Sequence, residues 1–255
     1  MLILINSLRF PNYINYMINK TKLVDTIEKY YLNGLTESAK YIIQNKTLTI
    51  PFQSTNRDIF GKIISPIDLD DAEFGVYDTN PLLKLLNILN KDIVIEYSKT
   101  FGIVEKLHIE DNQYKLLFTL SDSSLISKTP NAIDVPYQLT YNIDSEFVTK
   151  FIECKKALGS DIRTFTLEPN ADQTAKFILG DTSGYANKLE FSINCEVEGM
   201  PFIPLVFPSD NLREILQSNK NLDEGIMKVN EGGLMYLMFK EEDVISEYYI
   251  MASVN

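Results

Sequence analysis

The spacing of apolar residues predicts four amphipathic helices set among many short strands. In the first, Leu23, Ile27 and Tyr30 recur every three or four residues and so share one face. Gly34 is a natural stop for this helix, and Pro81 suits the first turn of the second. The helices are expected over residues 20–33, 80–91, 145–158 and 209–220.

Most of the remaining chain reads as strands, because β-branched and aromatic residues are bounded there by turn-forming ones. Asp111-Asn112 and Glu231-Gly232-Gly233 mark tight turns between neighbouring strands. The first half is expected to hold strands at 12–18, 40–44, 47–52, 59–64, 72–77, 92–98, 102–109 and 113–120. The second is expected to hold strands at 137–143, 162–167, 174–179, 188–197, 202–207, 226–230, 233–239 and 246–252.

This order of elements repeats after about 125 residues, giving strand, helix, several strands, helix and β-meander twice. A stretch rich in Ser, Asp, Asn and Pro, 121–136, separates the halves. A chain of 255 residues also suits two domains better than one. We therefore predict an α+β protein with an N-terminal extension (1–10), two similar domains (11–122 and 137–255) and a linker (123–136).

Composition excludes several classes of function. Cys154 and Cys195 are the only cysteines and His108 the only histidine, too few for a disulfide framework or a multi-histidine metal centre. No apolar run reaches 18 residues, so no membrane span is expected. The sequence shows no Walker A, G-x-S-x-G or G-x-G-x-x-G motif. We expect a cytoplasmic protein that is not an enzyme and needs no metal or cofactor.

The net charge of −11 conceals an uneven distribution. The four predicted helices hold ten basic and six acidic residues, whereas the rest of the chain holds 14 basic and 29 acidic residues. Helices lying side by side would therefore offer a basic face on an acidic protein, suited to a sequence-independent grip on phosphates. Lysines on a solvated helix face also serve solubility alone, and charge does not separate the two interpretations.

Four segments give the chain its resemblance to DNA sliding clamps, above all those of T-even-type tailed phages. The likeness covers most of residues 12–254 as scattered anchors, and the order and spacing of the anchors carry it. The anchors are IDLDDAEFGVYDTNPLLKLLNIL (67–89), KLLFTLSDSSLISKTP (115–130), YQLTYNIDSEFVTKFIECKKALG (137–159) and MYLMFKEEDVISEYYIMASV (235–254).

The resemblance implies a DNA-clamp fold in which six similar domains form a ring around duplex DNA, with the helices inside. Two domains per chain imply a homotrimer. The implied partners are double-stranded DNA of any sequence, a DNA polymerase that the clamp tethers for processive synthesis, an ATP-dependent clamp loader and further copies of the chain. If the protein is phage-encoded, its compartment is the cytoplasm of the bacterial host.

The resemblance also assigns candidate site residues. The DNA-facing cations would be Lys22, Lys29, Lys84, Lys91, Lys150, Lys156, Arg213 and Lys220, with Lys20 and Lys155 of ambiguous helical phase. Edge strands 113–120 and 174–179, represented by Leu117 and Ile178, would join the subunits. A partner-peptide pocket would combine Leu125 and Ile126 of the linker with Phe207, Pro208, Tyr249, Ile250 and Met251.

Two other interpretations remain open at this stage. A β-rich structural or adaptor protein of a phage particle would share the acidity and strand content, although it would not require helices paired at intervals of about 60 residues. An enzyme could use the acidic run Asp68, Asp70, Asp71 and Glu73 to hold Mg²⁺, although the run lacks the spacing of a calcium loop. A solvated acidic loop is the simpler interpretation of that run.

Overall fold

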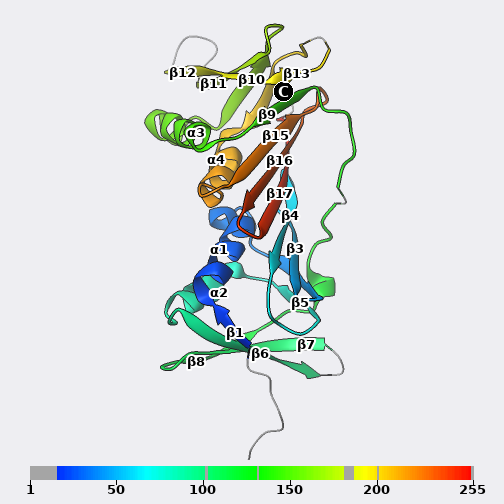
Figure 1. The fold of residues 1–255 in the computed structure, drawn as a ribbon, viewed down its shortest axis with the longest axis vertical. Coiled ribbons are helices and arrows are strands. Elements are labelled where there is room, and N and C mark those ends of the chain that lie inside the picture. The colour runs from blue at the N-terminus through cyan, green and yellow to red at the C-terminus, as the bar shows by residue number, and fades with distance from the viewer. Residues whose placement is uncertain (1–15, 101–102, 131, 181–186, 200, 254–255) are drawn as a thin grey trace, which may run out of the picture.

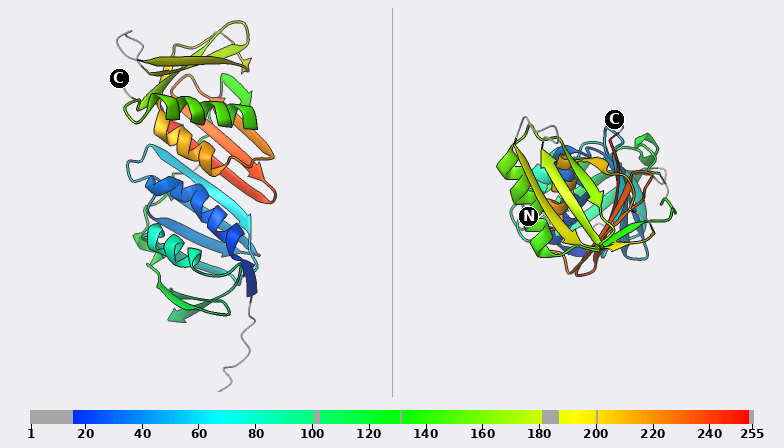
Figure 2. Two further views of the ribbon diagram at one scale, coloured as in Figure 1. Left: turned by 90° about the vertical axis from the view of Figure 1, so that its left-hand side faces the viewer. Right: turned by 90° about the horizontal axis from the view of Figure 1, so that it is seen from above.

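The computed structural model describes residues 16–100, 103–130, 132–180, 187–199 and 201–253. The molecule is elongated, and its α-helices lie in a row on one side of a long sheet (Figure 1). The segment between the halves runs along the opposite side. Seen from the helix side, the helices stack in the order α3, α4, α1, α2 along the long axis (Figure 2).

The described helices are α1 Lys20–Tyr31, α2 Thr79–Asn87, α3 Ser145–Leu158 and α4 Ser209–Ser218. Polar side chains fix the starts of three of them by accepting otherwise unpaired amide hydrogens. The caps are Asn19 for α1, Asp78 for α2 and Asp144 for α3. The four predicted helices are confirmed, although α2 and α4 end a few residues before the predicted stops at 91 and 220. No helix in the described ranges is long and apolar enough to span a membrane.

The strands of the first half are β1 Tyr16–Asn19, β2 Ala39–Gln44, β3 Thr47–Gln53, β4 Ile59–Pro66, β5 Ala72–Val76, β6 Asp92–Thr100, β7 Ile103–Glu110 and β8 Lys115–Thr119. Those of the second are β9 Leu139–Asn142, β10 Thr164–Pro169, β11 Thr174–Gly180, β12 Lys188–Asn194, β13 Glu196–Val197, β14 Leu205–Pro208, β15 Glu224–Val229, β16 Leu234–Glu241 and β17 Val244–Met251. The predicted N-terminal extension, 1–10, lies outside the described residues.

All strand pairs within the three sheets are antiparallel, and the sheets define the architecture. One sheet has the order β1-β6-β7-β8, a second β12-β11-β10-β14, and a nine-stranded sheet β13-β9-β15-β16-β17-β4-β3-β2-β5. The nine-stranded sheet runs through both halves, because β17 of the second half pairs with β4 of the first. The molecule is therefore α+β, with two helices packed on antiparallel sheets in each half.

Aromatic residues fill much of the core between helices and sheets in the second half. Phe147 and Phe151 of α3 pack against Phe177, whose ring stacks on those of Phe165 and Phe191 at centroid distances of 5.5 and 5.2 Å. These rings are buried, and such pairs add specific geometry to the burial of apolar area. Aromatic packing thus holds α3 against the sheet of the second half.

Candidate functional site

The row of helices presents five exposed lysines. Lys84 and Lys91 belong to α2 and the segment after it, Lys150 and Lys156 to α3, and Lys220 follows α4. None of the five forms an ion pair with a described residue, although Lys150 lies 5.2 Å from the centroid of the Phe191 ring. Four of these lysines lie on or just after α2 and α3, the helices at the two ends of the row.

Two of the predicted DNA-facing cations do not reach the surface, so their assignment is wrong. Lys29 is 2% exposed and Lys155 1% exposed. The Lys155 ammonium donates to the carbonyl oxygens of Gly159 and Ile162 and lies 3.2 Å from an Asp210 carboxylate oxygen. A buried ammonium needs such partners. Lys155 therefore stabilises the α3–α4 packing rather than offering charge to a ligand.

Lys29 ties the two halves together at the α1–α4 contact. Its ammonium lies 2.6 Å from Glu241 Oε2, and it donates to the Ser218 carbonyl at 3.1 Å and to Asn219 Oδ1 at 3.3 Å. The Tyr248 hydroxyl donates to the Lys29 carbonyl and accepts from the Asn219 amide. Ser218 is the last residue of α4, where a positive charge is favoured by the helix dipole.

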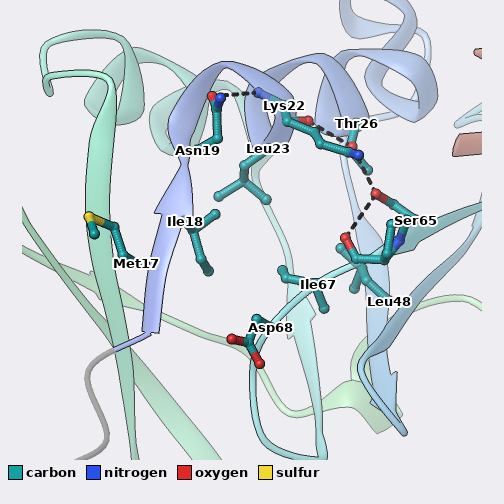
Figure 3. A pocket seen from close by; sticks show the side chains of 11 residues that line it. Met17, Ile18, Asn19, Lys22, Leu23, Thr26, Leu48, Ser65, Ile67 and Asp68 are labelled. Atoms are coloured by element: carbon teal, nitrogen blue, oxygen red, sulfur yellow. Dashed lines mark hydrogen bonds between the residues drawn. The ribbon is translucent and has the colours of Figure 1, made fainter. Parts of the chain in front are cut away.

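The other three predicted cations are partly exposed and already have partners. The Lys20 ammonium donates to the Leu89 carbonyl at 2.7 Å, which fastens α1 to the segment after α2. Arg213 is paired with Asp210 and Glu214 within α4. Lys22 lies 3.8 Å from an Asp243 carboxylate oxygen, beside a hollow of about 160 Å³ at the start of α1 (Figure 3). Their charges are partly compensated within the chain.

The middle of the helix row is acidic. A hollow of about 540 Å³ between α1 and α4 is lined by Asp25, Glu28, Glu214 and Glu241 as well as by lysines. Burial raises the pKa of Asp25 above its usual range, and the charge of Glu241 raises it further. The pKa of Glu28 is also raised, first by burial and then by Asp25. Carboxylates therefore outnumber lysines at the centre of the row, whereas four of the five exposed lysines lie at its ends.

The raised pKa of Asp25 predicts a pH-dependent effect on stability. A folded-state pKa above the unfolded value means that stability falls as the pH rises through that pKa. Asp25→Asn is expected to raise the midpoint of thermal unfolding at pH 7.5 by about 1–2 °C, a small effect because the side chain is exposed. The gain should shrink as the pH falls through the raised pKa of Asp25, because the carboxyl group of the wild type then becomes neutral. Thermal scans between pH 4 and 8 check this, and a pH-independent gain would contradict it.

A second hollow lies on the opposite side, between the linker and the outer face of the nine-stranded sheet. It measures about 220 Å³ and is lined by Phe60, Tyr249, Thr129, Pro130 and Ala132 among others. The rings of Phe60 and Tyr249 stack at a centroid distance of 4.8 Å. Ile133 and Val135 of the linker pack against the cluster that these two residues form with Leu234, so the linker both seals the junction and leaves a partly apolar pocket beside it.

Of the seven residues predicted for a peptide pocket, Tyr249 alone lines this hollow. Phe207 and Ile250 are fully buried and belong to the core, so their assignment is wrong. Alternation along β17 sends Ile250 towards the helices and Tyr249 outward. Ile126 is also buried, against the backbone of Gly75, where a Cβ atom would lie 2.8 Å from Ile126 Cγ1.

The other three residues of that prediction lie elsewhere on the molecule. Leu125 and Met251 are exposed, at 71% and 42%. Pro208 immediately precedes α4 as its N-cap residue. The pocket residues Thr129, Pro130 and Ala132 were missed because they are small or polar, and only the path of the linker brings them over the sheet.

The two predicted subunit-joining strands have different outcomes. Leu117 lies on β8, which forms the edge of its sheet, and is 52% exposed. Ile178 lies on β11, which is paired on both sides by β10 and β12, so residues 174–179 are not an edge strand. The two edges of that sheet are β12 and β14, and Leu189 on β12 is 37% exposed.

Carboxylates of the acidic run 68–73, which leads into β5, form ion pairs within the chain. Asp68 pairs with Lys46 at 2.8 Å, and Glu73 pairs with Lys40 at 2.7 Å. The hydrogen bond from Lys40 lowers the pKa of Glu73. No group of three or more His, Cys, Asp or Glu side chains within the described ranges is placed to hold a metal ion.

Solved structures with the same architecture are proliferating cell nuclear antigens. The protein from Entamoeba histolytica matches with a TM-score of 0.73 and 12% identity, covering 94% of this chain and 98% of that one. The A. fulgidus protein, solved with the C-terminal region of FEN-1 bound, matches with a TM-score of 0.74 and 14% identity, covering 95% and 99%. A chain of the PCNA2–PCNA3 complex from Sulfolobus tokodaii gives 0.69 and 13%, covering 94% and 99%.

These similarities identify the fold as the DNA-clamp fold over nearly the whole chain. No protein-family model and no curated protein matches the sequence. At 12–14% identity the likeness to solved structures defines the architecture.

Proposed function

We propose that the protein is a sliding clamp, a non-catalytic ring that encloses duplex DNA and tethers a replicative DNA polymerase. The observation that carries the proposal is the clamp fold along the whole chain, with its helices in one row on one face. The chain would contribute two domains, 11–122 and 137–255, joined by the linker 123–136. Three copies would then supply six domains, and the helices would line the hole.

The exposed lysines support a loose grip on the DNA backbone. Lys84 on α2 and Lys91 just after it lie at one end of the helix row, and Lys150 and Lys156 on α3 lie at the other. In a head-to-tail ring these ends meet, so cations would gather at each subunit joint while acidic residues separate the clusters. Mobile lysine charges hold phosphates without fixing a register, which allows the ring to move along the duplex.

Topological enclosure gives a test that separates a clamp from an ordinary DNA-binding protein. A ring threads over a free end of linear DNA, and blocking that end afterwards should trap it. We expect the protein to remain on DNA blocked at both ends during a wash in about 0.5 M salt, which breaks simple ionic contacts. It should leave DNA that keeps one open end. Equal loss from both DNAs would refute the proposal.

The pocket under the linker is our candidate site for the polymerase. It has an apolar floor, Phe60 and Tyr249, and an edge of linker residues, as short-peptide pockets commonly do. In the A. fulgidus complex the C-terminal region of another protein is bound to the clamp. We propose that an apolar C-terminal peptide of the polymerase binds here.

Filling this pocket should weaken peptide binding without unfolding the protein. Ala132→Trp places an indole at the exposed rim and is expected to weaken binding of a polymerase C-terminal peptide at least about tenfold. Ser127→Trp, also exposed on the linker but outside the pocket lining, is the matched control. Calorimetry measures both affinities, and equal binding by the two variants would place the site elsewhere.

Loading and compartment follow from the same proposal. A closed ring cannot reach an internal site on circular DNA, so a separate ATP-dependent clamp loader would have to open it. A phage origin would place the protein in the cytoplasm of a bacterial host.

A further inference from the structure

We propose that β8 of one copy pairs with β12 of a second copy in a single register, in which Lys115 lies opposite Glu190. The inference rests on the proposed ring and specifies its joint. Its basis is the joint within the chain, where β17 pairs with β4. In strand order β17 corresponds to β8, and β4 corresponds to β12. The edge strands β8 and β12 therefore correspond to two strands, β17 and β4, that already pair with each other within the chain.

The alignment of β8 with β17 follows strand by strand from the helix caps. Tyr16 and Tyr141 each lie three residues before an N-cap, Asn19 or Asp144. From each tyrosine, a row of paired residues crosses the sheet. The rows are Tyr16, Ile95, Ile109 and Leu116 in the first half, and Tyr141, Met227, Leu237 and Tyr248 in the second. Leu116 therefore corresponds to Tyr248, and Lys115 to Glu247.

The alignment of β12 with β4 starts from the second pair of helices. Thr79 and Ser209, the first residues of α2 and α4, donate their amides to the carbonyls of Glu37 and Arg163 at 2.9 and 2.8 Å. Ala39 and Phe165 lie two residues after Glu37 and Arg163, and from each of them a row of paired residues again crosses the sheet. The rows are Ala39, Phe52 and Gly61 in the first half, and Phe165, Leu179 and Leu189 in the second. Gly61 therefore corresponds to Leu189, and the next residue, Lys62, to Glu190.

The joint within the chain gives the register to transfer. Tyr248 lies opposite Gly61, and Glu247 lies opposite Lys62. The side chains of the second pair form an ion pair at 3.3 Å on the outer face of the sheet.

Applied to two copies, this register places Leu116 opposite Leu189 and Lys115 opposite Glu190. The charges are exchanged relative to the joint within the chain, since the lysine now lies on the strand that corresponds to β17. Alternation along β8 and β12 directs Lys115 and Glu190 to the same outer face, away from the core-facing Leu116 and Phe191. A cross-strand pair of opposite charges favours this register over shifted ones.

The charge exchange also determines which surfaces combine. Two β8 strands, or two β12 strands, aligned with these residues opposite each other would bring like charges together. The favoured joint is therefore head-to-tail, the kind of contact that generates rings.

Gly61 marks the place where the two joints cannot be identical. A Cβ atom there would lie 1.9 Å from the Glu247 carbonyl oxygen, and Leu189 has such an atom. The strands of the joint between copies must be farther apart at this pair. The decisive test accordingly uses the charged pair beside it.

The experiment compares Lys115→Glu, Glu190→Lys and the double variant by sedimentation equilibrium at low salt. Each single change puts like charges across the joint and should raise the dissociation constant of the assembly about 5- to 10-fold. The double change should restore it to within about twofold of wild type. Lys115 also contacts Glu110, and Glu190 contacts Lys188, both at 2.9 Å within one chain. Those local losses persist in the double variant, so rescue reports the contact between copies.

Lys106→Glu supplies the control, because it makes the same change in charge as Lys115→Glu at an exposed position away from the joint. Lys106 lies on β7, one strand away from the edge strand β8. It should leave assembly within about twofold of wild type. An assembling wild type with no rescue in the double variant would overturn the register and leave the ring proposal intact. A wild type that stays monomeric and is not retained on end-blocked DNA would overturn both.

Discussion

Lys29→Ala is expected to lower the free energy of unfolding by about 2–4 kcal/mol, a large effect for one lysine on a helix. The Lys29 ammonium is the centre of the contact between the halves, where it meets Glu241 and the oxygens of Ser218 and Asn219. Removing it leaves these acceptors without their cation in a partly buried site, where Asn219 is 1% exposed and Glu241 lines the hollow between α1 and α4. Unpaired buried polar groups retain their desolvation cost.

The change should also alter how the protein unfolds. Lys29 lies on α1, whereas its partners lie on β16 and at the end of α4, so the contact couples the two halves. We expect the variant to unfold in urea with two transitions, or with a lower slope, where the wild type shows a more cooperative one. Circular dichroism followed against urea concentration measures both quantities.

Two further variants separate charge from packing. Lys84→Ala removes an exposed lysine from α2 and should change stability by less than about 0.5 kcal/mol. Lys29→Met with Glu241→Gln keeps the buried stem and removes both charges, and should recover part of the loss. If Lys29→Ala is no more harmful than Lys84→Ala, the network does not stabilise the junction.

The helices and strands were predictable because each depends on local sequence. The 3.6-residue period of α1 and the stop near Gly34 are visible without any tertiary contact. The same holds for the repeated order of elements, which places corresponding helices on one side of both halves.

The burial of Lys29 and Lys155 could not be predicted in the same way. The polarity pattern assigns Lys29 to solvent and leaves the helical phase of Lys155 ambiguous, and an acidic partner of each comes from another element, Glu241 for Lys29 and Asp210 for Lys155. For Lys29 the distance in sequence to Glu241 is 212 residues. A polar side chain enters the core only when other groups supply its hydrogen bonds, and periodicity does not show where those groups will lie.

The error over residues 174–179 has a different cause. The sequence identifies β11 as a strand, but an edge strand and an internal strand with one buried face alternate alike. The order β12-β11-β10-β14 depends on which strands pair. The pocket under the linker was missed for a similar reason, since its residues carry no distinctive apolar pattern.

Reversing Lys84 and Lys150 together to Glu is expected to weaken binding to a short duplex at least about 100-fold at 50 mM salt. Both lysines are exposed, lie on α2 and α3, and make no ion pair with a described residue. In a trimer the change affects six positions around the hole. The slope of log affinity against log salt should become shallower by up to about 5, because each lost phosphate contact removes close to one unit.

The matched control reverses two lysines on the outside of the proposed ring. Lys106 lies on the outer face of β7 and Lys128 on the linker, and both are exposed. Lys106→Glu with Lys128→Glu changes the net charge equally and should reduce binding less than about fivefold, since these positions lie away from the helix row. Fluorescence anisotropy with a labelled duplex measures both variants, and light scattering verifies that each keeps the mass of the wild type. A loss of the same size in both would show that overall charge, and not the helix face, determines the affinity.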